Sequence, residues 1–147
     1  MPSGLTRKSV LRTAFQVLIF CPMVLTAAQL DIQVFGIRNA RGTVRCAVYR
    51  GPEGFPDLSK HAIRRSAISA SSGKIKFVFT DIKPGRYAAS VFHDENDNGK
   101  LDKNLLSIPK EGYVISNNPS RARSPRYKDA EFSVNEPTTQ IELRMHY

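Results

Sequence analysis

Apolar and polar side chains alternate with a period of two over most of the chain after residue 29, which is typical of β-strands with one buried face. The alternation predicts strands at residues 30–34, 44–48, 74–79 and 139–145. In the stretch "RYAASVF", residues 86–92, the side chains on both faces are mostly small or apolar. Such a strand is expected in the middle of a sheet, where neighbouring strands and a second layer cover it.

The segments between these strands are rich in turn-forming residues. "NARG", Asn39–Gly42, predicts a hairpin between the first two strands, and "SSG", Ser71–Gly73, precedes the third. A short helix is predicted at Asp57–Arg65, directly after Pro56. Short strands, tight turns and one short helix predict an all-β fold: an antiparallel Ig-like or transthyretin-like β-sandwich with about seven strands.

The first 28 residues have the composition of an export signal. A basic start with Arg7, Lys8 and Arg12 precedes an apolar stretch from Ala14 to Leu25, and the small residues Thr26–Ala28 follow. The apolar stretch is shorter than the roughly 20 residues that a membrane-spanning helix needs. We therefore predict a signal peptide at residues 1–28 and a single β-sandwich domain at residues 29–147, exported to the periplasm or the medium.

An uncleaved anchor is the alternative for this segment, and no later stretch is apolar enough to span a membrane. Cys21 lies in the predicted signal peptide, so the exported chain has only Cys46 and cannot form an internal disulfide. Because Cys46 alternates with core valines, we expect it to be a buried, unreactive side chain.

The chain is basic, with 22 Lys and Arg against 13 Asp and Glu and a net charge of +9. Three basic residues and no acidic residue fall in the predicted signal peptide, which leaves +6 for the domain. This excess is compatible with an anionic partner, but it is also an ordinary charge for solubility, and we favour the second interpretation.

"HDENDNGKLD", His93–Asp102, has the spacing of oxygen ligands in a calcium loop. Asp94, Asn96 and Asn98 occupy the first, third and fifth positions, and the next residue is the glycine of the sharp turn. Lys100 could add its backbone carbonyl at the seventh position, and Asp102 lies at the ninth. The predicted metal ligands are therefore Asp94, Asn96, Asn98, Lys100 and Asp102, and the predicted cofactor is calcium.

The second half of the calcium pattern is missing. Leu105 stands at the twelfth position, where a bidentate glutamate is usual, so a remote acid such as Glu111 or Asp129 would have to complete the ligand set. Asp, Asn and Gly are also the preferred turn formers, so the stretch could simply reverse the chain. If it binds calcium, we expect Asp94→Ala to abolish the stabilisation while leaving the calcium-free stability nearly unchanged.

The stretch Asp81–Asn118, with its Tyr-containing strand, "HDENDNGKLD" and "IPKE", resembles the secreted bacterial family called domain of unknown function 2141. Gly42–Asp57 and Tyr127–Val134 resemble the same family, so the resemblance covers nearly the whole predicted domain. It implies a small exported β-sandwich and does not imply a particular activity.

Other candidate sites are less specific. His93 beside Asp94 is compatible with acid–base chemistry, but the spacing names no nucleophile, and a structural position is expected for His61, His93 and His146. The chain has no phosphate-binding glycine loop, no His-Glu-x-x-His and no Gly-x-Ser-x-Gly.

One basic loop could bind an anionic component of the cell envelope. It contains Arg121, Arg123, Arg126 and Lys128 around Tyr127. A solvated loop is the commoner explanation of such a run, and we expect no nucleic acid partner.

Two classes of function remain open from the sequence. The first is a non-enzymatic exported binding or accessory module with a calcium-binding loop at residues 94–102. The second is a hydrolase acting on envelope material, with its site near His93 and Asp94. Without a nucleophile, base and orienting group, the first is favoured.

Overall fold

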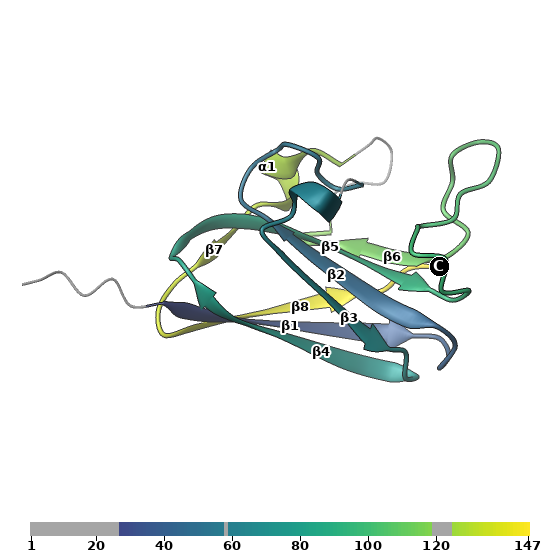
Figure 1. Cartoon of the computed structure of the whole chain (residues 1–147), viewed down its shortest axis with the longest axis horizontal. Helices are drawn as coiled ribbons and strands as arrows, with labels where there is room; N and C mark the ends of the chain where they lie inside the picture. The colour runs from purple at the N-terminus through teal and green to yellow at the C-terminus, as the bar shows by residue number, and fades with distance from the viewer. Residues whose placement is uncertain (1–26, 58, 119–124) are drawn as a thin grey trace, which may run out of the picture.

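Two β-sheets packed face to face form the fold (Figure 1). The computed structural model describes residues 27–57, 59–118 and 125–147. One sheet has the strand order β4-β1-β8, and the other has the order β3-β2-β5-β6, with β7 also paired to β5. The elements are β1 (Ala28–Ile37), β2 (Thr43–Tyr49), the 3-10 turn η1 (Ser59–His61), β3 (Arg64–Ser69), β4 (Gly73–Ile82), β5 (Gly85–Asp94), β6 (Gly112–Ile115), α1 (Tyr127–Ala130), β7 (Phe132–Val134) and β8 (Thr138–Arg144).

The predicted all-β sandwich is confirmed, with one departure from antiparallel pairing. β8 runs parallel to β1, in the register Ile32↔Ile141, whereas β1 and β4 are antiparallel. Parallel neighbours such as β1 and β8 cannot be joined by a hairpin and need a crossover connection. Here the chain enters β8 from β7, which lies in the other sheet.

One local prediction is wrong, and another holds only in part. Asn39–Gly42 does not form a hairpin, because β1 and β2 belong to different sheets and the segment crosses between them. The predicted helix at Asp57–Arg65 is reduced to the 3-10 turn η1, and its last two residues enter β3. β3 is an exposed edge strand and has no strong apolar pattern. Its extended conformation comes from backbone pairing with β2 over Thr43–Val48.

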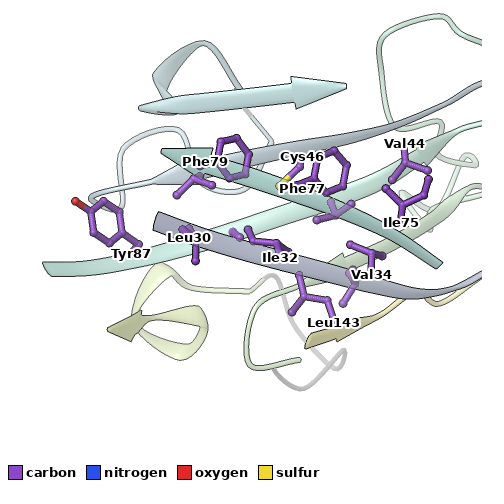
Figure 2. Close-up of a cluster of buried hydrophobic side chains, with 14 of the residues drawn as sticks. Leu30, Ile32, Val34, Val44, Cys46, Ile75, Phe77, Phe79, Tyr87 and Leu143 are labelled. Atoms are coloured by element: carbon purple, nitrogen blue, oxygen red, sulfur yellow. The ribbon is translucent and has the colours of Figure 1, made fainter. Parts of the chain in front are cut away.

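The core lies between the sheets and is formed by the inward-facing side chains of both (Figure 2). β1 places every second side chain from Ala28 to Val34 in it, as the alternation predicted, and β4 does so from Ile75 to Phe79. The residues labelled in Figure 2 are Leu30, Ile32, Val34, Val44, Cys46, Ile75, Phe77, Phe79, Tyr87 and Leu143.

Cys46 is part of this core and is 3% exposed, so its predicted burial is confirmed. Burial raises the pKa of the Cys46 thiol, because the thiolate would lose its hydration. The thiol therefore stays protonated at neutral pH, and a lack of reactivity toward thiol reagents remains a prediction.

Residues 1–26, most of the predicted signal peptide, lie outside the described residues. Ala28, the last residue of that prediction, is the first residue of β1, where it pairs with Ile82 and is 1% exposed. Over the described ranges, none of the helices has the length and apolar character needed to cross a bilayer.

Candidate functional site

The acidic loop, residues 94–102, begins where the central strand β5 ends (Figure 1). β5 lies between β2 and β6, and the pair His93↔Gly112 is the last one between β5 and β6. The chain therefore leaves the sheet at Asp94 and returns to it at Gly112. The whole segment 95–111, of which the acidic loop is the first part, is therefore fixed at both ends by the pairing of β5 with β6.

Asp94 is completely buried and holds the loop in shape. Its Oδ1 accepts the N–H of Asn98 at 3.0 Å, and its Oδ2 accepts the N–H of Gly99 at 2.8 Å. Arg45 of β2 donates from Nε to the same Oδ2 at 2.7 Å. A carboxylate without water is stabilised by this combination of backbone donors and a positive charge.

Three of the other predicted ligands come together at the exposed side of the loop. Asp102 Oδ2 accepts from Asn96 Nδ2 at 2.8 Å, and Asp102 Oδ1 accepts from Asn98 Nδ2 at 3.0 Å. Lys100 takes part through its backbone N–H, which donates to Asn98 Oδ1 at 2.8 Å. These amide and carboxylate groups therefore lie next to one another and are bonded to one another, and their role as metal ligands stays a prediction.

Glu111 is the remote acid that joins the loop. It is 6% exposed, and its two carboxylate oxygens accept the N–H groups of Glu95 at 2.9 Å and Asp102 at 3.0 Å. Asp129, the other candidate, lies in α1 and binds Arg126 with both oxygens at 3.0 Å. Glu111 thus ties the beginning of the loop to its end.

Metal binding is not evident from side-chain clustering alone. Among the described residues, no group of three or more His, Cys, Asp and Glu side chains is arranged to hold a metal ion. The predicted ligand set contains two carboxylates, Asp94 and Asp102, so it would depend on amide and carbonyl oxygens for the rest.

His93 is buried below the acidic loop, and both of its ring nitrogens are bonded. Nε2 lies 2.7 Å from the carbonyl oxygen of Arg41, and Nδ1 lies 2.7 Å from the hydroxyl of Tyr147. Since a carbonyl can only accept, Nε2 carries a proton and donates it to Arg41, while Nδ1 shares a hydrogen bond with the Tyr147 hydroxyl. With 0% exposure, His93 has no free nitrogen to offer a substrate.

The segment between β1 and β2 covers the loop with positive charge, a feature that the sequence did not reveal. Arg38 and Arg41 bind the two carboxylate oxygens of Glu95 at 2.6 and 2.7 Å, and Asn39 donates to it at 3.3 Å. Burial raises the pKa of Glu95, but the hydrogen bonds from Asn39 and the two arginines outweigh it, so that the pKa is lowered. Glu95 is therefore ionised at neutral pH and neutralised by its neighbours.

Half of the basic residues in the predicted anionic-partner site, Arg121 and Arg123, lie outside the described residues. Arg126 is paired with Asp129 within one turn of α1, while Lys128 is exposed. The structure thus describes half of this cluster and shows one of its charges balanced by a carboxylate.

The fold and the site together describe a class of protein: a two-sheet β-sandwich domain whose central strand ends in a loop held by a buried aspartate. The chain belongs to a family described as an uncharacterized protein conserved in bacteria, DUF2141, whose model matches residues 32–142. This confirms the family resemblance seen in the sequence. No curated protein and no solved structure matches the chain.

Proposed function

We propose that this domain is an exported, non-enzymatic binding or accessory module whose acidic loop binds calcium. The observation that supports it is the contact of Asn96 and Asn98 with the Asp102 carboxylate, at 2.8 and 3.0 Å, in a loop whose first residue is the buried Asp94. Calcium prefers carboxylate, amide and carbonyl oxygens, which are the groups gathered here.

Binding requires the two amides to change partners. Their nitrogens now donate to Asp102, while the Oδ1 atoms of Asn96 and Asn98 accept backbone N–H groups at 3.1 and 2.8 Å. A half turn of a side-chain amide exchanges its oxygen with its nitrogen. Asn96 and Asn98 can therefore present an oxygen to a cation, and the hydrogen bonds that their side chains now make are then lost. That loss and the small number of charged ligands favour weak binding, with Kd of about 10⁻⁴ to 10⁻³ M.

The alternative, a hydrolase with a site at His93 and Asp94, has little support from the geometry. A general base must reach the proton that it removes. Both side chains are 0% exposed, and their polar atoms are bonded to Arg41, Tyr147 and Arg45.

Calcium is expected to stabilise the folded domain. If it binds the folded state alone, the gain is RT ln(1 + [Ca²⁺]/Kd), about 1.4 kcal/mol at a tenfold excess over Kd. The measurement is the melting temperature across a calcium titration at fixed ionic strength. Asp102→Ala should abolish the gain, because Asp102 is a proposed ligand that is only half buried.

Lys103→Ala is the matched control, since Lys103 is the next residue and its exposed side chain is no proposed ligand. It should retain the full calcium response. If calcium raises the melting temperature of the wild type no more than sodium of equal ionic strength does, the loop is a turn and the calcium proposal is wrong.

Export is tested by the intact mass of the protein recovered outside the cytoplasm. We expect a species lacking the N-terminal segment and beginning close to Gln29. Cleavage one residue earlier would keep Ala28, whose pairing with Ile82 starts β1, and the two products differ by one alanine in mass. A recovered species that still carries residues 1–26 would contradict the cleavage.

A further inference from the structure

Residues 103–110 form a projecting finger that rises from the end of the sandwich between the acidic loop and β6 (Figure 1). Its two sides are paired: Lys103 and Pro109 form a β-bridge, and the N–H of Asn104 donates to the carbonyl of Ile108 at 2.8 Å. At the base, the N–H of Lys110 donates to the carbonyl of Asp102 at 2.8 Å. The finger is therefore an ordered hairpin-like projection.

Its tip is held by one side chain. Asn104 Oδ1 accepts the N–H groups of Leu106 at 2.9 Å and Ile108 at 3.0 Å, and the Asn104 carbonyl accepts the N–H of Ser107 at 2.9 Å. These bonds satisfy the backbone of the turn locally. Its apolar side chains are thus left to point outward on a prearranged backbone.

The tip exposes three large apolar side chains in four residues. Leu105 is 104% exposed, Leu106 is 78% exposed and Ile108 is 55% exposed. Lys103 and Lys110 flank them on the two sides of the finger, and both are exposed. Residues 103–110 contain no acidic residue, and Lys103 Nζ lies 3.5 Å from Oδ2 of the exposed Asp57. An apolar tip between lysines has the composition of a segment that lies in the interface of an anionic membrane.

The size of the tip favours a lipid surface over a protein partner. A stable protein–protein interface buries about 800 Å² on each side, around 20–30 residues. Three side chains at the end of a projection offer much less contact than that. A bilayer needs only a shallow apolar insertion, about 5–10 Å deep, with positive charge at the level of the phosphates.

We propose that the finger binds anionic lipid bilayers by inserting Leu105, Leu106 and Ile108, with Lys103 and Lys110 near the lipid phosphates. The proposal does not depend on calcium, because the hydrogen bonds that shape the finger come from Asn104 and the paired sides. A negative calcium titration would leave it standing.

The chain has no tryptophan, so a single one introduced at the tip is a unique reporter. In the full chain, Leu106→Trp places it on the finger, and Val78→Trp places it on β4, where Val78 is 50% exposed. Both variants carry the same N-terminal segment, so a difference between them reports the finger alone. The probes are vesicles of phosphatidylcholine alone and of phosphatidylcholine mixed with phosphatidylglycerol.

We expect anionic vesicles to shift the Leu106→Trp emission to the blue and to leave Val78→Trp unchanged. The shift should weaken with added salt, which screens the lysines, and with phosphatidylcholine alone. An unshifted Leu106→Trp emission with every vesicle overturns the proposal in favour of a protein partner. Equal shifts in both variants overturn it too, because the finger would then not be the inserting part.

A second variant tests the apolar tip itself. With Ile108→Trp as the reporter, changing Leu105 and Leu106 to asparagine should raise the lipid concentration for a half-maximal shift by about tenfold or more. Both leucines are exposed, so folding should be preserved, which an unchanged melting temperature would verify. An unchanged lipid requirement would refute insertion of the tip.

Discussion

Replacing Asp94 by alanine is expected to lower the free energy of unfolding by about 3 kcal/mol, with or without calcium. The carboxylate is 0% exposed and accepts two backbone N–H groups of the loop as well as Arg45 Nε. Its removal leaves these donors without their buried acceptor. Because Arg45 keeps 34% of its side chain in water, its lost partner accounts for only part of the effect.

Urea unfolding in the presence of a chelator measures this loss. Asp102→Ala is the control, because its carboxylate bonds two asparagine side chains at the exposed side of the loop, and it should cost about 0.5 kcal/mol. Equal losses of unfolding free energy for the two variants would mean that Asp94 is not buried in solution.

This expectation reverses the one drawn from the sequence, in which Asp94→Ala left the calcium-free stability nearly unchanged. That expectation treated Asp94 as a metal ligand alone. In the structure, Asp94 is the last residue of β5, faces Arg45 and is covered like the rest of the strand. Part of this could have been predicted, because small and apolar side chains on both faces of residues 86–92 already indicated a central strand. The same coverage continues through His93 and Asp94.

Strand positions were predictable where one face of the strand is buried, since alternation then follows from the fold itself. β3 has an exposed and mostly polar sequence, so its pairing with β2 left no such pattern. The sequence also did not show which strands belong to which sheet. A short polar segment such as Asn39–Gly42 suits a hairpin and a crossing between sheets equally well. Only tertiary packing distinguishes the two.

The contacts of the candidate site also fall into two groups: local contacts that the sequence indicates and contacts from distant strands that it does not. Asn96, Asn98 and Asp102 lie within one short loop, so their closeness follows from their spacing, while their role as ligands stays a prediction. Arg45 comes from another strand and reaches the loop only in the folded chain, as do the arginines on Glu95. Glu111 was one of two acids considered, and the β5–β6 pairing selects it over Asp129.

Gly42→Ala is expected to cost about 4 kcal/mol or more of unfolding free energy, because this glycine lies directly against the start of the acidic loop. Its φ is +67°, and a Cβ there would collide with the carbonyl oxygen of Asp94 and lie 2.9 Å from the backbone of Glu95. Neither neighbour can yield easily, since Asp94 pairs with Thr43 in the sheet. The crossing segment or the loop must move, and with it the carbonyl of Arg41 that accepts from His93.

Gly73→Ala is the matched control for this prediction. Gly73 also has a positive φ, +94°, but a Cβ there would meet nothing within 4 Å, so its substitution reports backbone strain without a collision. That strain alone costs about 1–2 kcal/mol. Urea unfolding of both variants therefore isolates the collision as the difference between the two losses. If Gly42→Ala loses no more stability than Gly73→Ala, the contact between the crossing segment and the acidic loop is looser than the structure has it, and the loop's shape must then rest on Asp94 and Glu111 alone.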